Sequence, residues 1–563
     1  MESRRERKLK KNQSVAVAEL YINRVNILRV ILIVIIVSLI GRLYYIQIVK
    51  GPELYQCAKN QSFKEIPNGI KRGKIYDRHM NLLTNEYTTK YLVIFPQSFP
   101  ITNNSIEAIK VLTKTEIDKK LVATRPLKLE IVNDDKKATE YVKTLKGAFV
   151  IDYNERYSKE QLATHTIGYL IRVDNVGASG LEKRYDEILK EDQDYRIGAI
   201  VDAQKRMILG KGYQKFEQES LKNGKNLVTT LDSNIQRIVE KEFDKSYKKG
   251  SVVVLDVKTG DVLAMVSRPN FDPNNVASYL KNNSKELYNK AIQIAYPPGS
   301  IFKIIVAAAA LESNEIDENN EYDCIGYEEI EGTKIKCGSY KTGGHGKLNL
   351  KEAFSKSCNS YFIQLGEKIG GEKILEMAEK FGLGAKTNIE LLEETNGNLA
   401  TKDYVKGAGV GNISIGQGTI ETTPMQIAKM TSIIANEGID KGIHLIKKIV
   451  NNDGDNVQTF NNIDGNRVIS KETAKKIGEM MHSVVIEGTA KNIATKMSNS
   501  AGKTGSAESI KQGEKIVHAW FTGYFPYKEP KYIVTIFIEE GEAGGRVAAP
   551  LFEKIATRLK DPK

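Results

Sequence analysis

The sequence predicts an α/β protein in which a sheet flanked by helices follows an elongated α+β region and one N-terminal membrane-spanning helix. Three observations support this prediction. Strand patterns stand at both ends of the C-terminal part with helical patterns between them, mixed polar segments precede residue 226, and an apolar run lies near the N-terminus.

Length and composition agree with several packed domains. At about 100–200 residues per domain, the 563 residues suggest three or four folding units. Apolar residues make up 41% and charged residues 27%, which excludes whole-chain disorder. The net charge of +13 (83 Lys and Arg minus 70 Asp and Glu) favours anionic surfaces. Because this charge is spread out and no recognition motif is present, we expect no nucleic-acid partner.

The N-terminus has the pattern of an uncleaved membrane anchor. An apolar run covers residues 30–41 and continues over 43–49, so Arg29 and Arg42 must extend toward the two interfaces. The bulky Leu43, Tyr44 and Tyr45 argue against the alternative, a cleaved signal peptide, which needs small residues there. The basic residues before the run predict a cytoplasmic tail at 1–24, an anchor at 25–49 and an extracytoplasmic remainder.

A compositional shift at Gly224 divides the remainder into an α+β region at 50–225 and a C-terminal domain at 226–563. The C-terminal domain begins with a predicted strand, an Asp232 cap and an amphipathic helix. Two apolar strands around a Lys-Thr-Gly-Asp turn follow, and the predicted elements near the C-terminus are strands at His518–Phe525 and Tyr532–Glu539 and a helix at Ala549–Leu559. This order predicts a sheet that joins distant segments.

A serine acyl-transfer site needs a nucleophile, a base, a proton relay and an oxyanion hole. The pattern S-x-x-K places a hydroxyl and an amine on one helix face, and it begins here at Ser246, Ser278, Ser300 and Ser500. Only Ser300 follows a Pro-Pro-Gly turn and opens an apolar, alanine-rich helix. Burial on that helix would lower the pKa of Lys303, as a general base requires. We therefore predict Ser300 as nucleophile and Lys303 as base.

Two further motifs complete the candidate site. S-x-N occurs once, at Ser357-Cys358-Asn359, where the hydroxyl can relay a proton and the amide can orient substrate or Lys303. K-T-G occurs at 258–260, 341–343 and 503–505. Only the third copy is flanked by small residues, which let a substrate backbone approach closely. We select Lys503 and Thr504 as carboxylate-binding groups.

In the order Ser300, Ser357, Lys503, the motifs resemble the S-x-x-K, S-x-N, K-T-G set of penicillin-binding proteins and related β-lactamases. The segments RGKIYDR (72–78), HTIGYL (165–170) and GLEKRYD (180–186) resemble the non-catalytic pedestal of class B penicillin-binding proteins. YPPGSIFK, SIGQGTIETTPMQIA (414–428), EGTA (487–490), AGKTGSAE and HAWFTGYFP resemble their transpeptidase domain. The resemblance implies a penicillin-binding/serine β-lactamase-like transpeptidase domain on a pedestal, without a glycosyltransferase domain.

The resemblance also implies a function, a peptidoglycan D,D-transpeptidase of the bacterial cell membrane. Ser300 would attack a stem peptide ending in D-Ala-D-Ala, an amine of a second stem would resolve the acyl-enzyme, and β-lactams would acylate Ser300. Ser357 would relay the proton to the leaving group, and Asn359 would hold Lys303 and the substrate. The substrate-binding strand would contribute Lys503, Thr504, Gly505 and Ser506, with the backbone N–H groups of Ser300 and Ser506 as oxyanion donors.

The chemistry implied by the resemblance requires no cofactor, and the implied partner is a polytopic membrane glycosyltransferase. Ser506 stands where the family often has Thr. Met80 stands where the sequence after RGKIYDR usually continues to Gly, so we expect that turn to differ locally.

Two alternatives share the motifs or the architecture: a β-lactam hydrolase or sensor, and a non-catalytic scaffold of a cell-wall synthesis complex. The long pedestal argues against the first and the complete catalytic set against the second.

Three of the four cysteines lie in one segment with a histidine, in the spacing Cys324-x12-Cys337-x7-His345-x12-Cys358. Three Cys and one His form a usual structural zinc set, and the glycine-rich segment between them can fold round an ion. The alternatives are a Cys324–Cys337 disulfide, since the domain is expected outside the cytoplasm, or free buried thiols. A zinc ion would position Ser357 and Asn359 and would not activate water.

Overall fold

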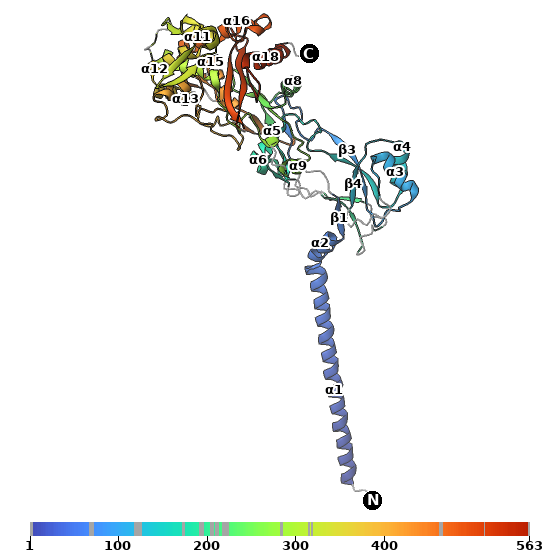
Figure 1. The fold of residues 1–563 in the computed structure, drawn as a ribbon. Helices are drawn as coiled ribbons and strands as arrows, with labels where there is room; N and C mark the ends of the chain where they lie inside the picture. The colour runs from blue at the N-terminus through green and yellow to red at the C-terminus, as the bar shows by residue number, and fades with distance from the viewer. Residues whose placement is uncertain are drawn as a thin grey trace. The chain divides into compact units, whose positions relative to one another are not determined.

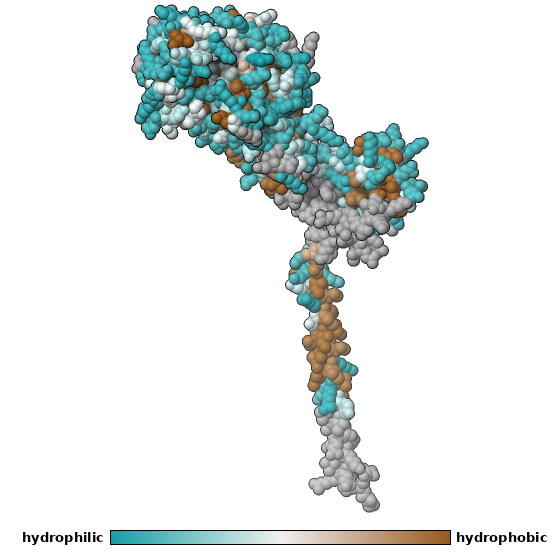
Figure 2. Space-filling model, in the orientation of Figure 1, coloured by the Kyte–Doolittle hydropathy of each residue, from teal (hydrophilic) through white to brown (hydrophobic). Residues whose placement is uncertain are grey.

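The computed structural model describes residues 4–66, 72–117, 126–171, 175–190, 196–202, 208, 213–216, 224–281, 285–313, 316, 319–460, 465–511 and 513–560. The N-terminal helix α1 (Arg4–Tyr44) continues through a π-helical turn, η1 (Tyr45–Val49), into α2 (Gly51–Ser62) (Figure 1). Residues 21–49 form a 29-residue apolar span that no other part of the protein covers, and Figure 2 shows its apolar surface. Since about 20 residues suffice to cross a bilayer, this helix fits a single-pass membrane anchor.

The chain divides into two compact units, and the region before residue 226 contributes to both. The first unit holds residues 1–68, 90–152 and 194–217, and the second holds 69–89, 153–193 and 218–563. Two stretches of the predicted pedestal therefore pack with the C-terminal domain. The boundary at residue 226 stays a prediction about the functional division of the chain.

The first unit contains two small sheets. The sheet β4-β3-β5 packs on two helices, and its elements are β3 (Thr88–Ile94), α3 (Asn103–Thr113), β4 (Leu127–Glu130), α4 (Lys136–Thr144) and β5 (Ala148–Asn154). Thr102 and Ser105 form a capping box that starts α3, because each side chain accepts the backbone N–H of the other. The second sheet consists of β1 (Phe63–Ile66), β8 (Arg196–Ile200) and β9 (Tyr213–Phe216).

A five-stranded antiparallel sheet organises the second unit, in the order β12-β11-β23-β22-β21. Its strands are β11 (Gly250–Asp256), β12 (Val262–Arg268), β21 (Ala501–Lys511), β22 (Glu514–Phe525) and β23 (Tyr532–Ile538). The predicted joining of distant segments is confirmed, since Val252 pairs with Ile536. Helices α8 (Ser233–Asp244), α15 (Pro424–Ala435) and α18 (Gly544–Lys560) pack against this sheet. Asp232 caps α8, as its sequence predicts.

A helical region lies in sequence between the two halves of the sheet. Its elements include η3 (Gly299–Phe302), α10 (Lys303–Glu312), α11 (Leu350–Ser355), α12 (Asn359–Ile369), α13 (Gly371–Lys380), α14 (Ala408–Ser414), α16 (Lys471–Ile486), η5 (Lys491–Ile493) and α17 (Ala494–Met497). Helix α10 is buried from Lys303 to Ala310. An alanine-rich helix suits this central place because its small side chains let α12, α13 and α16 pack closely around it.

Two short pairs of strands form a loop region before α11. Strand β13 (Tyr322–Cys324) pairs with β16 (Gly346–Leu348), and β14 (Tyr327–Ile330) forms a hairpin with β15 (Thr333–Lys336). The helical turn η4 (Tyr340–Thr342) connects the hairpin to β16. This region carries three of the four predicted metal ligands, Cys324, Cys337 and His345, and the fourth, Cys358, caps α12.

The N-terminal segments of the second unit are joined to it by strand pairing and by buried polar contacts. Strand β2 (Ile75–Tyr76) enters a sheet with β10 (Lys225–Thr229), β18 (Ile446–Asn451) and β19 (Asn456–Thr459). The fully buried Glu182 lies between Arg72, at 2.6 Å, and Arg156, at 2.7 Å. Shorter elements complete this part: α5 (Thr164–Ile167), β6 (Leu170–Ile171), β7 (Val176–Gly177), α6 (Gly180–Arg184), α7 (Asp186–Leu189), α9 (Val276–Lys281), η2 (Lys285–Leu287), β17 (Ile439–Asp440) and β20 (Asn466–Arg467).

The turn at Met80 keeps the backbone shape that a glycine would adopt. Met80 has φ +66°, in the left-handed region. Its neighbour Asp77 is fully buried and accepts the backbone N–H groups of His79 and Asn81. Asp77 also accepts the Ser233 hydroxyl at 2.7 Å. These bonds hold the turn, so Met80 carries backbone strain of about 1–2 kcal/mol.

Candidate active site

Ser300 lies in a tight turn pressed against strand β21. Gly299 has φ +56°, and a Cβ atom there would lie 2.7 Å from the carbonyl oxygen of Ser506. The Gly299 N–H donates to the Gly416 carbonyl at 3.0 Å, and the Trp520 indole N–H donates to the Pro297 carbonyl at 3.1 Å. The Pro-Pro-Gly sequence therefore matters because only glycine permits this approach. The turn places Ser300 beside the K-T-G strand.

Lys303 begins helix α10 and is completely buried. Its Nζ donates to the Ser357 carbonyl at 2.8 Å and to Asn359 Oδ1 at 2.8 Å, and Ser357 Oγ lies at 3.4 Å. Burial lowers the pKa of Lys303 to about 8, because the interior disfavours the charged ammonium. The neutral amine, which accepts a proton, is thereby accessible near neutral pH.

The S-x-N turn occupies the short connection between α11 and α12. Ser357 adopts φ +57°, and Cys358 caps α12 with its sulfur. The Asn359 side chain bridges two elements: its oxygen accepts from Lys303, and its Nδ2 donates to the Lys336 carbonyl at 3.1 Å. The contact with Lys336, at the end of hairpin β14–β15, was not predicted. It connects the loop region directly to the site.

Lys503 approaches the same serine from strand β21. Its Nζ donates to Ser357 Oγ at 3.0 Å and to the Thr504 carbonyl at 3.0 Å, and the side chain is completely buried. Burial lowers the pKa of Lys503 well below its usual range, and the charge of Lys303 lowers it further. Two amines thus share one hydroxyl oxygen. Repulsion between them favours a state in which at least one is neutral.

The K-T-G strand presents its hydroxyl groups to different neighbours. Thr504 Oγ1 lies 2.6 Å from the hydroxyl of Thr489, in the loop after α16. Ser506 Oγ accepts the Gly544 N–H at 3.1 Å, at the start of α18. Gly505 has no room for a side chain, because an added Cβ would lie 2.9 Å from the Pro298 carbonyl. Thr489 was missed as a site residue, although it lies in the EGTA segment that signals the resemblance.

The other K-T-G copies lie elsewhere. Lys258, Thr259 and Gly260 form the turn between β11 and β12, where Asp256 accepts the first two backbone N–H groups. Lys341 and Thr342 belong to turn η4. Structure thus separates the three copies as the sequence context predicts.

The four predicted metal ligands converge on one point. Their ligand atoms all lie within 4.8 Å of one another, and all three cysteines are free and buried. His345 Nδ1 lies 3.6 Å from the sulfurs of both Cys324 and Cys337, and the Cys337 and Cys358 sulfurs are 3.9 Å apart. The hydrogen bond from Cys358 lowers the pKa of Cys337 to about 3. The cluster borders the S-x-N turn, since the Asn359 N–H donates to the Cys337 sulfur at 3.4 Å.

The fold brings the buried amines of Lys303 and Lys503 to the Ser357 hydroxyl beside the Ser300 turn, an arrangement suited to serine acyl transfer. Comparison with known proteins identifies the family. A family model, Penicillin binding protein transpeptidase domain, matches residues 250–557, and another, Penicillin-binding Protein dimerisation domain, matches 68–229. The chain belongs to the penicillin-binding proteins with a transpeptidase domain.

The relatives include characterised cell-wall proteins. The chain is 31% identical to stage V sporulation protein D of Bacillus subtilis, over 94% of this chain and 85% of the relative. It is 28% identical to the peptidoglycan D,D-transpeptidase MrdA of Escherichia coli K12, over 90% and 89%. Among solved structures, penicillin-binding protein 3 of Mycobacterium tuberculosis, complexed with aztreonam, matches with TM-score 0.64 and 25% identity, over 88% of this chain and 96% of that one. A chain from a peptidoglycan synthase complex matches with TM-score 0.69 and 26% identity, over 95% and 98%.

Proposed function

We propose that this protein is a membrane-anchored peptidoglycan D,D-transpeptidase that cross-links stem peptides through a Ser300 acyl-enzyme. The observation that carries the proposal is the meeting of Lys303 and Lys503 at Ser357 Oγ, at 3.4 and 3.0 Å, beside the Ser300 turn. This arrangement offers a nucleophile and a proton relay that are partly exposed, beside a buried base.

Acylation begins when Lys303, as the neutral amine, takes the proton of the Ser300 hydroxyl. The Ser300 oxygen attacks the carbonyl carbon of the penultimate D-alanine, and the backbone N–H groups of Ser300 and Ser506 stabilise the oxyanion. Collapse breaks the peptide bond to the terminal D-alanine, whose nitrogen receives a proton through Ser357. The amine of a second stem then attacks the Ser300 ester, forming the cross-link amide and restoring the serine.

Binding of the substrate carboxylate prepares the base. A carboxylate at Lys503 and Thr504 would favour the charged form of Lys503. A charged Lys503 in turn favours the neutral form of Lys303, because both amines contact Ser357 Oγ. The substrate would thereby help to create the proton acceptor that attacks it.

Intact-mass analysis of the full chain in detergent, after incubation with benzylpenicillin, tests this proposal. We expect one covalent adduct, lost in Ser300→Ala and kept in Ser246→Ala, which alters another S-x-x-K copy. An adduct that disappears within minutes would indicate a β-lactam hydrolase. If the wild-type protein forms no adduct and cells that carry Ser300→Ala still grow, the protein is a scaffold.

We propose that Cys324, Cys337, His345 and Cys358 hold a structural zinc ion. The separations His345–Cys324, His345–Cys337 and Cys337–Cys358, at 3.6–3.9 Å, match the edges of a tetrahedron with Zn–S and Zn–N bonds of about 2.0–2.3 Å, and all the ligand atoms lie within 4.8 Å of one another. Zinc would hold three thiolates and the imidazole, and these residues would fix the turn that carries Ser357 and Asn359. Metal analysis of anaerobically purified protein should give one zinc per chain, unchanged in Cys57→Ser and lost in Cys337→Ser. Zinc below about a tenth of an equivalent with two thiols missing would indicate the disulfide instead.

We propose that the basic tail is cytoplasmic and that α1 meets a polytopic membrane glycosyltransferase. The match to a chain from a peptidoglycan synthase complex supports such a partner. Cys57 has an exposed thiol just past the anchor, so a membrane-impermeant maleimide should label it in intact cells but not in Cys57→Ser. Photo-crosslinkers along α1 should capture a multi-span protein. The absence of maleimide labelling would contradict the cytoplasmic tail, and the absence of such a crosslink would contradict the glycosyltransferase partner.

A further inference from the structure

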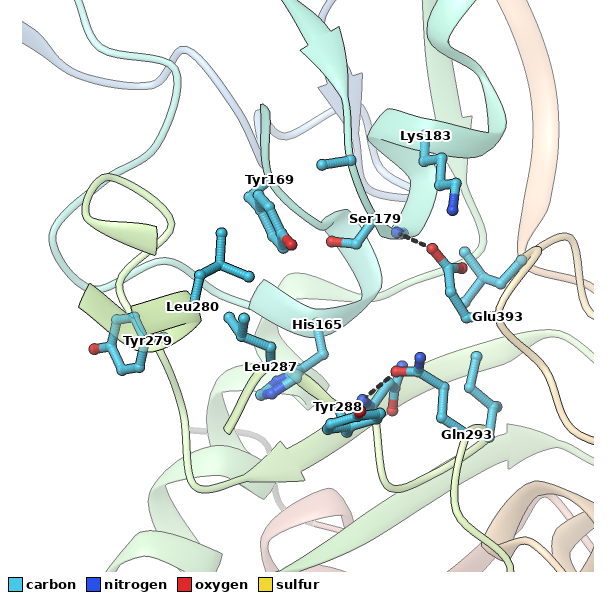
Figure 3. A pocket seen from close by; sticks show the side chains of 15 residues that line it. His165, Tyr169, Ser179, Lys183, Tyr279, Leu280, Leu287, Tyr288, Gln293 and Glu393 are labelled. Atoms are coloured by element: carbon cyan, nitrogen blue, oxygen red, sulfur yellow. Dashed lines mark hydrogen bonds between the residues drawn. The ribbon is translucent and has the colours of Figure 1, made fainter. Parts of the chain in front are cut away.

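A cavity lies in the second unit, apart from the proposed catalytic residues. It has a volume of about 240 Å³ and is lined by residues of three chain segments, among them His165, Tyr169, Lys183, Tyr288, Gln293 and Glu393 (Figure 3). The first segment holds the HTIGYL and GLEKRYD sequences, which the transpeptidation chemistry does not use. None of the proposed catalytic or zinc-binding residues lines this cavity.

The lining combines aromatic faces with polar groups. Tyr169, Tyr279 and Tyr288 surround the cavity together with Leu280 and Leu287 (Figure 3). Tyr288 is 46% exposed and Leu280 is 60% exposed, so apolar surface is available to an occupant from solvent. A phenol offers an apolar ring face and a polar tip. Such a lining suits a ligand that is itself apolar on its faces and polar at its edges.

The charges of the lining favour a neutral ligand. Lys183 and Glu393 lie at one end of the cavity (Figure 3) and balance each other. Glu393 is held in place because its Oε1 accepts the Gly180 N–H at 3.1 Å. His165 lies fully buried, and burial lowers its pKa to about 4, so it adds no positive charge. Glu393 would repel a phosphate or a lone carboxylate, and Lys183 would repel a lone cation.

The walls are held rigidly before any ligand binds. The His165 Nε2 hydrogen-bonds to the Glu286 carbonyl at 2.7 Å, and its ring packs edge-on against Phe271 at 4.9 Å. The Asn289 N–H donates to Gln293 Oε1, and the Ile292 carbonyl accepts the Thr395 N–H at 3.0 Å. A preformed site loses little entropy when it binds a ligand. This wall segment also leads along the chain to the Ser300 turn.

We infer that this cavity binds one neutral saccharide unit of a peptidoglycan glycan strand. A pyranose ring has C–H faces that pack on tyrosine rings and hydroxyl or amide edges that bond to Gln293, Lys183 and Glu393. The volume is below the about 300 Å³ of small drug pockets, so it admits one ring-sized unit with the strand continuing outside. The inference rests on the proposed function, since a peptidoglycan substrate supplies the glycan. The cavity gives the enzyme a second contact to the polymer besides the stem peptide.

Titration of the full chain in detergent with a peptide-free tetrasaccharide of β-1,4-linked N-acetylglucosamine, followed by calorimetry, tests the inference. We expect binding that weakens roughly tenfold in Tyr288→Ala and stays near wild type in Tyr288→Phe, which keeps the ring face. Tyr87→Ala removes an exposed tyrosine outside the cavity and serves as the matched control. Thermal unfolding of each variant shows that it is folded.

Prior acylation with benzylpenicillin separates the two proposals. Unchanged saccharide binding by the acylated protein supports the cavity, and loss of binding places the glycan in the catalytic cleft and overturns the inference. Wild-type binding by Tyr288→Ala, or no binding by the wild type at millimolar saccharide, also overturns it. Saccharide binding by a protein that benzylpenicillin does not acylate would support the cavity while the proposed function fails.

Discussion

The two structures that hold the S-x-N turn differ in kind. On one side stand Lys303, on the buried helix α10, and Lys503, on the edge strand β21 of the five-stranded sheet, and both side chains are completely buried. On the other side stands the Cys/His cluster, whose ligand atoms lie within 4.8 Å of one another. Three of its residues come from the loop region of two short strand pairs, and Cys358 caps α12. The lysines are held by apolar packing of the whole second unit. The loop region packs through Ile330 and Ile335 on a small apolar cluster with Ile363, and the four side chains of the Cys/His cluster would hold it further.

This difference divides the proposed catalytic residues into two groups. The robust half is the Ser300 turn with α10 and β21, and the conditional half is Asn359 with the Cys/His cluster. The Ser300 turn, α10 and β21 should keep their geometry whenever the core is folded. Asn359 should keep its geometry only while the cluster holds, since it contacts the Cys337 sulfur and the Lys336 carbonyl. The following predictions test this division, from the largest effect to the smallest.

Lys303→Ala should nearly abolish acylation of Ser300 without unfolding the robust half. We expect the acylation rate by a fluorescent penicillin to fall about 10³-fold, because the general base is lost. The thermal midpoint should not fall, because the substitution removes a buried amine whose charged form burial disfavours. Stopped-flow fluorescence and thermal unfolding measure the two effects. Acylation within tenfold of wild type would assign the base to Lys503.

Cys337→Ser should weaken the conditional half while the core persists. We expect acylation to fall about 10–100-fold, in the range for lost support of a metal-site neighbour, and hydrogen exchange to rise in residues 322–349 but not in β11, β22 or β23. Cys57→Ser, which removes an exposed thiol, is the control. Equal loss of protection in the central sheet would show that the two halves are not separable.

The pH dependence of acylation should follow the protonation of Lys303, which belongs to the robust half. Since the pKa of Lys303 is lowered to about 8, the neutral amine is lost as pH falls below that value. The acylation rate should therefore drop about tenfold per pH unit on the acid side and level off above about pH 8. Measurement of the acylation rate from pH 5.5 to 9.5 should show this break near pH 8. A pH-independent rate would contradict Lys303 as the base.

Thr489→Val should reduce recognition of the substrate carboxylate modestly. Its hydroxyl lies 2.6 Å from that of Thr504, so the variant leaves Thr504 without a partner and loses about 1 kcal/mol, or about fivefold in acylation efficiency. Thr489→Ser should restore most of it. If the loss appears only in the maximal rate and not in the apparent affinity, Thr489 acts on the acylation step and not on binding.

Met80→Gly should give the smallest effect, a gain in stability. Met80 is 44% exposed and has φ +66°, so glycine relieves strain at little loss of burial. We expect a gain of about 0.5–1 kcal/mol, the strain relieved less the backbone entropy of glycine, in denaturant unfolding of the second unit. Met80→Ala keeps the strained φ and should show no gain; a gain in both would assign the effect to the side chain.

Much of the site follows from local sequence. The Pro-Pro-Gly before Ser300, the alanine-rich helix and the small residues around Lys503 select, among four S-x-x-K and three K-T-G motifs, the copies that the fold brings together, because each environment has a local chemical signature. The spacing of three cysteines and a histidine likewise predicts a cluster that the fold brings together. Local sequence did not predict the left-handed backbone of Met80, which accompanies hydrogen bonds from the His79 and Asn81 N–H groups to Asp77.

By itself, the sequence predicted the apolar N-terminal helix, the sheet that joins distant segments and the side chains proposed for catalysis, because hydrophobic pattern and motif chemistry are local properties. Only the tertiary structure decided that Lys503 shares Ser357 with Lys303, that Thr489 meets Thr504 and that His165 and Tyr288 line one cavity. These are contacts between segments separated by more than ten, and often more than a hundred, positions. They depend on how the chain packs, because burial and hydrogen bonding are set by neighbours in space.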